Sequence, residues 1–222
     1  MDQGGAAGHC VYVDTEGSFV AERAAEMAEA LVDVLQQSVE HRVEERVENG
    51  DIPAEKLAEE VAKELGLLPT VDSILAKIYY YRVHDYVEQI ALVNVLSSLL
   101  KEDPLIKLIV VDSVAFHFRH DFENMSLRTR LLNNMAQSLL ELAEGRQVAV
   151  VLMNQVTTKI SATSASRLAP ALGESWGHTC TNRVILYWKD GCRKAHLYKS
   201  PSQEATTGNR FLSPLRSSTL TL

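Results

Sequence analysis

Apolar residues along this 222-residue chain fall into two patterns, short continuous runs and longer stretches with helical spacing. The short runs are rich in Val, Ile and Tyr, which favour β-structure, and they predict strands at 11–15, 78–83, 106–111 and 148–153. The longer stretches repeat apolar residues every three or four positions and predict helices at 20–49, 51–66, 86–101 and 126–145. In the first helix, the repeat of Met27, Leu31, Val34 and Leu35 predicts one apolar side.

The order of these elements predicts an α/β fold. Strands and helices alternate as far as residue 153, which is typical of a mostly parallel sheet flanked by helices. The runs 183–189 and 193–199 are joined by Asp190-Gly191 and predict a C-terminal β-hairpin. Ligands of parallel sheets bind at the carboxyl ends of the strands, so the polar residues that follow the strands are candidates for a site.

Two segments lack any apolar period. Residues 156–172 are rich in Thr, Ser and Ala and predict a long loop, which in a compact domain is usually functional or mobile. From Ser202 the chain is polar and rich in Ser and Thr, which is typical of a disordered tail. We therefore expect a core domain at 1–203 and a disordered tail at 204–222.

Composition and charge narrow the class of protein only slightly. The length suits one domain, and the net charge of −7 argues against general coating of nucleic acid but not against a local basic patch. Much of the acid lies between Glu22 and Glu64. The three cysteines have no metal-ligand spacing and indicate a reducing compartment, and we expect neither a membrane span nor a signal sequence.

Three side chains at strand ends carry the candidate chemistry. Asp112 follows Leu-Ile-Val-Val, as the magnesium-holding acid of a phosphate-loop ATPase does, although an acid there can also cap a turn. Glu16 could orient a water for attack on a phosphate, or could stabilise the start of the next helix. Gln155 could sense a phosphate, or could be an ordinary loop amide. Because all three follow strands of one predicted sheet, we expect them to converge.

Together these motifs resemble a known family. Asp-Thr-Glu-Gly at 14–17, Asp-Ser at 112–113 and Asn-Gln at 154–155 are similar to the ATPase core of RecA-family recombinases, in the Rad-type branch of eukaryotes and archaea. Further stretches resemble the C-type paralogs of the eukaryotic Rad recombinase, and these are residues 118–121, 126–133, 170–178 and 199–201. The resemblance covers residues 4–203 and implies a RecA-like sheet.

The resemblance also implies a function, which is DNA repair by homologous recombination. Members of the family bind ATP and Mg²⁺ between protomers and assemble on single-stranded DNA. Their paralogs form heteromeric complexes that support recombinase filaments and act on branched DNA. The location implied is the nucleus, and also the cytoplasm, although the family's basic nuclear-import cluster is not found in this chain.

By position, the resemblance assigns roles to individual residues. Glu16 matches the catalytic acid that orients water, and Asp112 matches the Walker B acid that holds magnesium. Gln155 matches the residue that senses phosphate, and His178 matches a histidine that approaches a neighbouring subunit's nucleotide. The segment of Lys199, Ser200 and Pro201 matches the one that caps a neighbour's ATP.

The resemblance places two DNA-binding loops at 119–128 and 156–173. The cations expected to contact DNA in and beside them are Arg119, Arg128, Arg130 and Lys159. Such cations track the phosphates of a single strand. The simpler alternatives are that Arg128 and Arg130 only occupy the start of a helix and that Lys159 is a solvated surface residue.

One family motif is not found in these 222 residues, the Gly-rich phosphate loop (Walker A) that ends in Lys and Ser or Thr. We therefore expect a partial core truncated on its N-terminal side, as in an isoform or a gene fragment, and a chain that alone is ATPase-deficient. The alternative is a non-catalytic RecA-like scaffold that binds partner paralogs. A hexameric helicase or circadian-type ATPase is disfavoured by the stretches at 126–130 and 173–178.

Overall fold

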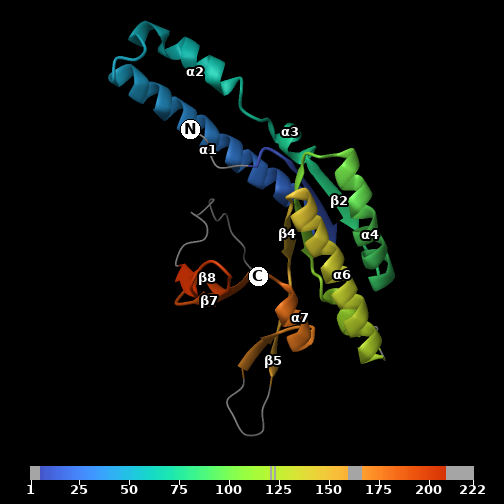
Figure 1. Ribbon diagram of the computed structural model, residues 1–222. Coiled ribbons are helices and arrows are strands. Elements are labelled where there is room, and N and C mark those ends of the chain that lie inside the picture. Colours follow the sequence, from blue (N-terminus) through green and yellow to red (C-terminus); the bar gives the residue numbers. More distant parts are fainter. Residues whose placement is uncertain (1–5, 121, 123, 160–166, 209–222) are drawn as a thin grey trace.

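The computed structural model describes residues 6–120, 122, 124–159 and 167–208. Its centre is a parallel sheet with strand order β2-β1-β3-β4 (Figure 1). The strands are β1 (His9–Asp14), β2 (Ile78–Arg82), β3 (Ile106–Asp112) and β4 (Ala149–Leu152). All three pairings are parallel, which confirms the predicted fold class.

Two helices, α4 (Tyr86–Glu102) and α6 (Met125–Arg146), pack on one face of this sheet. The sheet contributes the buried residues Val11, Val13, Ile109 and Val111, and the helices contribute Val93, Leu96, Leu100, Leu132, Met135, Leu139 and Leu142. Each helix starts at a side-chain cap, since Asp85 accepts the N–H of Glu88 and Asn124 accepts two N–H groups of the first turn. Because successive side chains of a strand point to opposite faces, Tyr12 and Asp112 lie on the other face of the sheet.

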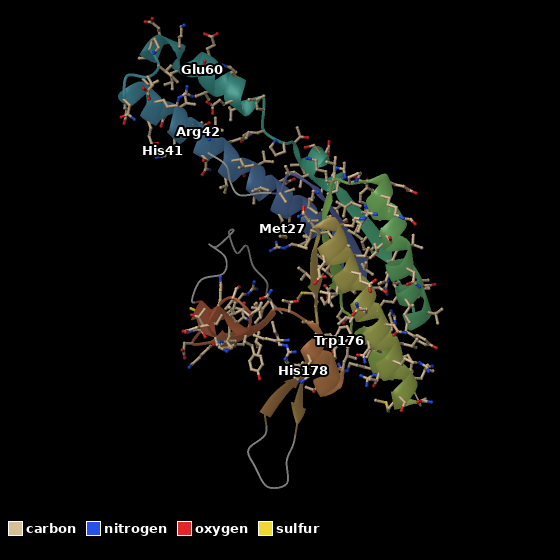
Figure 2. All side chains as sticks on the ribbon, viewed as in Figure 1. Met27, His41, Arg42, Glu60, Trp176 and His178 are labelled. Carbon is tan, nitrogen blue, oxygen red and sulfur yellow. The ribbon has the colours of Figure 1, made fainter. Side chains whose placement is uncertain are left out.

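A helical arm extends away from the sheet (Figure 1). It comprises α1 (Ala21–Glu48), a short 3₁₀ turn η1 (Ala54–Lys56) and α2 (Leu57–Leu65), and α3 (Val71–Leu75) leads back to β2. The arm has its own small core, in which Val39, Val43 and Ile52 are buried against Leu57, Val61 and Leu65. Ion pairs from Arg42 and Arg46 to Glu64 join the two helices, and Figure 2 shows Arg42 and Glu60 where α1 and α2 face each other.

The helix at 20–49 is confirmed, but the apolar side that its sequence predicts is not the side that packs. Met27, Leu31 and Val34 are 54%, 47% and 54% exposed, whereas Ala28, Val39 and Val43 are buried. The packed side is rotated from the expected one because α2 and α3 approach α1 from that direction, which the spacing within α1 does not encode.

The C-terminal hairpin is confirmed as β7 (Arg183–Lys189) and β8 (Cys192–Lys199). Asp190 and Gly191 both have positive φ, 55° and 71°, as a tight two-residue hairpin turn requires. A third strand, β9 (Thr206–Gly208), pairs with β8 where the tail was expected to begin. The expected disorder is therefore wrong for these residues, since their backbone pairs with the edge of β8; residues 209–222 lie outside the described part.

The loop predicted at 156–172 is ordered at both ends. β5 (Val156–Lys159) pairs antiparallel with β6 (Arg167–Pro170), and residues 160–166 lie outside the described part. Two short helices flank these strands, α5 (Phe116–His120) and α7 (Gly173–Thr179), and the latter is anchored by the buried Trp176. Across the described residues, no helix combines the length and apolar character that a membrane span needs.

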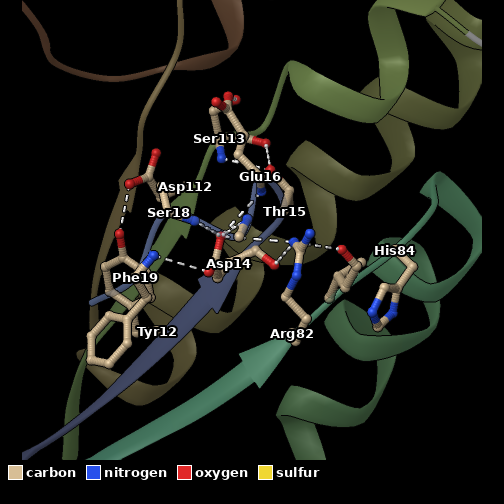
Figure 3. A network of polar contacts seen from close by, with 12 residues as sticks. Tyr12, Asp14, Thr15, Glu16, Ser18, Phe19, Arg82, His84, Asp112 and Ser113 are labelled. Atoms are coloured by element: carbon tan, nitrogen blue, oxygen red, sulfur yellow. Dashed lines mark hydrogen bonds and ion pairs between the residues drawn. The ribbon is translucent and has the colours of Figure 1, made fainter. Parts of the chain in front are cut away.

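The buried Asp14 carboxylate fixes the turn that follows β1 (Figure 3). It accepts the N–H groups of Glu16, Gly17, Ser18 and Phe19 at 3.1, 2.7, 3.2 and 3.1 Å, and the Tyr80 hydroxyl at 3.0 Å. Burial raises the pKa of this carboxyl group, but the backbone donors and the Tyr80 hydroxyl outweigh burial, so the pKa lies below its ordinary value. The turn therefore depends on an ionised Asp14.

Substitution of Asp14 should destabilise the fold in a pH-dependent way. We expect Asp14→Ala to lower the free energy of unfolding by about 3 kcal/mol at pH 7, because four backbone N–H groups and the Tyr80 hydroxyl lose a charged acceptor. Because the folded pKa lies below the ordinary 3.8, the contribution of Asp14 is complete above that value and is lost as the pH falls through the folded pKa. Urea denaturation should show the same difference in the free energy of unfolding between the unchanged chain and Asp14→Ala at pH 7 and pH 5, and a smaller difference at pH 3. An exposed control, Asp33→Asn, should have no effect, and an equal loss at every pH would contradict this account.

A second prediction concerns Gln89, which is fully buried in α4 and whose amide has no hydrogen-bond partner among the described residues. An unpaired buried amide destabilises the fold, so we expect Gln89→Leu to raise the free energy of unfolding by about 1–2 kcal/mol. In thermal denaturation this corresponds to a rise in Tm of about 3–6 °C. A fall in Tm for Gln89→Leu would show that the amide is paired.

Candidate functional site

The predicted convergence at the carboxyl edge of the sheet is found. Glu16 follows β1, and its Oε1 accepts the Ser113 hydroxyl at 2.8 Å and the Gln155 side-chain amide at 3.1 Å. Ser113 follows β3 and Gln155 follows β4, so three strand ends meet at one carboxylate. Glu16 is exposed, and its Oε2 has no partner among the described residues. That oxygen is available to accept a hydrogen bond from a water or a ligand.

Backbone contacts hold the first two strand ends together. The buried Thr15 hydroxyl accepts the Ser113 N–H at 2.7 Å and donates to the Ser113 carbonyl at 2.9 Å. The Thr15 N–H donates to the Asp112 carbonyl at 2.8 Å. Glu16 and Asp112 therefore cannot separate without breaking buried hydrogen bonds.

The Asp112 carboxylate is oriented by a tyrosine. The Tyr12 hydroxyl, on the neighbouring strand, donates to Asp112 Oδ2 at 2.6 Å (Figure 3). Burial and then the bond to Asp112 raise the pKa of Tyr12 well above its ordinary value, so the phenol remains a donor at neutral pH. This contact leaves Asp112 Oδ1 free of partners among the described residues.

A layer of three aromatic rings supports the carboxylates of Asp112 and Asp14. Phe19 lies between Tyr12 and Tyr80, with ring centroids 5.1 and 4.9 Å apart. Tyr12 donates to Asp112, and Tyr80 donates to Asp14. The sequence did not predict this layer. Because side chains alternate along a strand, the sequence indicates that Tyr12 and Asp14 share one face of the sheet. It does not indicate that Tyr12 pairs with Tyr80 of the neighbouring strand.

Arg82 stabilises the turn that follows β1, and the sequence did not predict this role either. Its guanidinium donates to the carbonyls of Asp14 and Val83 at 2.9 and 3.1 Å. Gly17 has a φ of +76°, and a Cβ there would lie 3.1 Å from the Arg82 guanidinium. Only glycine therefore fits this turn without strain, and the turn sets the direction of Glu16.

The side chains at this edge suit a hard cation. Glu16, Asp112 and Ser113 offer oxygen ligands, and Mg²⁺ is usually held by one or two carboxylates together with substrate phosphates and water. Among the described residues, no group of three His, Cys, Asp or Glu side chains is placed to hold a metal alone. The residues here that could hold such an ion are Asp112 and Ser113, if phosphate and water supplied the remaining ligands.

The predicted DNA-contacting residues lie in different settings. The exposed Arg119 donates to Gln155 Oε1, which links it to Glu16 through one amide. Arg128 is half-buried, its Nε donates to the Phe118 carbonyl at 2.7 Å, and burial lowers the pKa of its guanidinium. Arg130 is exposed on α6, and Lys159 is the last residue of β5.

Arg119 and Arg128 line one cavity. This cavity has a volume of about 270 Å³, and Phe118, Phe122, Thr157 and Pro170 contribute to its walls. Residues of both segments that were predicted to form DNA-binding loops line this cavity.

A second group lies apart from Glu16. The Lys199 ammonium donates to the carbonyls of His178 and Cys180 at 3.3 and 2.7 Å, at the C-terminal end of α7. The Ser200 hydroxyl contacts the Ser202 hydroxyl at 3.5 Å, and His178 and Pro201 are exposed. No hydrogen bond or ion pair between described residues connects this group to Glu16, so their predicted roles toward a neighbour's nucleotide stay predictions.

Comparison with known proteins agrees with this architecture. The family model described as Rad51 matches residues 48–209. The chain is 45% identical over 203 residues to "DNA repair protein RAD51 homolog 3" of Dictyostelium discoideum, which is 91% of this chain and 49% of that protein. The protein of the same name from Cricetulus griseus is 43% identical over 204 residues, with 92% and 51% covered.

A more distant relative is "DNA repair and recombination protein RadA" of Aeropyrum pernix, 34% identical over 188 residues, with 83% of this chain and 47% of that protein covered. The chain thus spans about half the length of these relatives. The predicted resemblance to Rad recombinase paralogs and the RecA-like fold class are both confirmed. Since the matched segment extends from the end of α1 through β9, the chain belongs to the Rad51 family.

Proposed function

We propose that this chain forms the edge of a recombinase paralog that contacts nucleotide and DNA, and that it acts in DNA repair by homologous recombination. The observation that carries the proposal is the continuous chain of contacts from Ser113 through Glu16 and Gln155 to Arg119. The repair and recombination activities named for the relatives support the same class of function.

In this proposal Glu16 is the group that orients the attacking water. Two neutral donors hold its Oε1, so the carboxylate keeps a fixed direction while Oε2 accepts a proton from water. Asp112, oriented by Tyr12, would hold magnesium. ATP with Mg²⁺ would supply the phosphoryl group and the charge that neutralises it.

Gln155 would couple the nucleotide edge to DNA. Its amide nitrogen donates to Glu16 and its amide oxygen accepts from Arg119, so the two contacts constrain one side chain. A DNA phosphate that bound Arg119 would compete for that guanidinium and release Gln155. The position of Glu16 would then depend on whether DNA is bound.

We also propose that the chain works in heteromeric complexes with other Rad paralogs, in the nucleus and also in the cytoplasm, on single-stranded or branched DNA. The exposed His178 and Pro201, with Lys199 at the end of β8 and Ser200 directly after it, would offer a surface for a neighbouring subunit's nucleotide. A second candidate function is a non-catalytic scaffold for partner paralogs.

Removal of the Arg119 charge should weaken binding of single-stranded DNA. We expect Arg119→Ala to raise the Kd for a fluorescein-labelled oligonucleotide about fivefold to tenfold, and to reduce the slope of log K against log salt by about 1. Fluorescence anisotropy between 50 and 200 mM salt measures both. Arg23→Ala removes an exposed cation of α1 and should change neither quantity. Equal losses for both variants would indicate that only total charge matters.

The chain alone should bind ATP weakly. Titration of a fluorescent ATP analogue with Mg²⁺ should show no saturable binding at micromolar concentrations, because a Gly-rich loop supplies most of the N–H groups that hold phosphate. The double variant Glu16→Gln/Asp112→Asn is the matched control and should give the same baseline. Saturable micromolar binding that the double variant loses would contradict the expectation and identify a complete nucleotide site.

A further inference from the structure

The cavity that Arg119 and Arg128 line is formed by α5, the start of α6, β5 and the segment that runs from β6 into α7. Figure 1 shows α7 and β5 near the end of α6 at which that helix begins. The volume of about 270 Å³ lies just below the roughly 300–1,000 Å³ of pockets for drug-sized ligands. The cavity therefore suits one small group and not a helix or a strand of a partner protein.

One wall of this cavity is aromatic and apolar. Phe122 stacks on Phe118, with ring centroids 5.5 Å apart and an angle of 5° between the rings, and the Tyr86 ring lies 4.5 Å from Phe122. Phe118 is fully buried, so it supports Phe122 from behind. Phe122 is half-buried and Met125 is 55% exposed, and both line the cavity. These two side chains can therefore contact a flat apolar group.

The same cavity is cationic. Its described lining residues include two arginines and no Asp, Glu or Lys. The half-buried Arg128 donates its Nε to the Phe118 carbonyl, and its two terminal nitrogens have no hydrogen-bond or ion-pair partner among the described residues. A half-buried guanidinium has lost part of its hydration, and no acid replaces it here, so an anion that entered the cavity would be stabilised.

The apolar wall and the guanidinium together select a class of ligand. An inorganic anion would pair with Arg128 but would leave the aromatic wall uncovered, and an uncharged ring would leave the guanidinium unpaired. A nucleotide carries a flat ring and a phosphate on one unit, so it satisfies both. Single-stranded nucleic acid is bound by this combination, in which aromatic side chains stack on bases and cations follow the phosphates.

We propose that this cavity receives one unstacked base of a bound single strand. The base lies against Phe122 and Met125, and the adjoining phosphate pairs with Arg128. This inference rests on the proposed function, in which the chain binds DNA, and adds to it a subsite that contacts a base. Phosphate contacts are the same for a strand with bases and for an abasic strand, whereas a base in the cavity contributes affinity that only the first strand has.

The test measures binding of two fluorescein-labelled strands of equal length to the full 222-residue chain. One strand is oligo(dT), and the other has the same number of phosphates but is abasic throughout, so it cannot shift to place a base in the cavity. Fluorescence anisotropy at one fixed salt concentration should show that oligo(dT) binds about tenfold more tightly, as expected for the stacking of one base on an aromatic side chain. Free thymidine monophosphate should displace oligo(dT) at a lower concentration than inorganic phosphate does.

The apolar wall is tested by Phe122→Leu, which keeps an apolar side chain but removes the flat ring. It should reduce the preference for oligo(dT) to about twofold and leave the affinity for the abasic strand unchanged. Phe116→Leu is the matched control, because Phe116 is 37% exposed on α5 and is not among the residues that line the cavity, and it should keep the full preference. Met125→Ser changes the same wall at an exposed position outside the aromatic cluster and should also lower the preference, and circular dichroism would verify that each variant folds.

The cation is tested separately by Arg128→Gln. This variant should weaken the binding of both strands by a similar factor of about fivefold, because it removes a phosphate contact that both strands share. The preference for oligo(dT) should remain, since the base contact is still present.

Three results would overturn the base subsite and leave the proposed DNA binding in place. They are equal binding of the two strands by the unchanged chain, a full preference for oligo(dT) in both Phe122→Leu and Met125→Ser, and displacement of oligo(dT) by inorganic phosphate as readily as by thymidine monophosphate. The last result would identify a site for anions only. A different result, in which neither strand binds, would contradict the proposed DNA binding and the base subsite together.

Discussion

The parallel register of β1, β3 and β4 is the constraint on which the rest of the site depends. Asp14 pairs with Asp112 and Val111 pairs with Leu152, so the strands end at the same level. When parallel strands end at the same level, the residues that follow each strand lie together at the carboxyl edge of the sheet. The hydrogen bonds of Glu16 with Ser113 and Gln155 are consequences of that arrangement. The buried Asp14 accepts hydrogen bonds from the backbone of the following turn and so fixes the position of Glu16.

Much of this architecture could be predicted from the sequence, because the relevant signals are local. Apolar runs of β-formers gave the four central strands, and the Asp190-Gly191 turn gave the hairpin. Their order was enough to predict that Glu16, Asp112 and Gln155 converge. Contacts between strands are different, since Tyr12 reaches Asp112 and Tyr80 reaches Asp14 only through the register of neighbouring strands. No pattern within a single strand encodes that register.

The errors in prediction have a common physical origin, which is tertiary packing that overrides local pattern. The apolar repeat of α1 is real, but α2 and α3 pack beside it and leave Met27 and Leu31 exposed. Thr206–Gly208 lacks a strand pattern, yet its backbone pairs with the edge of β8. Both departures lie away from the edge that holds Glu16. The molecule thus combines a sheet edge where three strand ends meet at Glu16 with an acidic arm in which Met27 and Leu31 of α1 are exposed.

The most direct test of this account is a double-mutant cycle between Glu16 and Ser113, read as the free energy of unfolding in urea. Glu16→Ala, Ser113→Ala and the double variant isolate the interaction between two side chains 97 residues apart in sequence. The account predicts a coupling energy of about 1 kcal/mol, the net value of a typical hydrogen bond, because Glu16 is exposed to solvent. Additive effects, with no coupling between the two positions, would contradict the convergence of strand ends on which the proposed function depends.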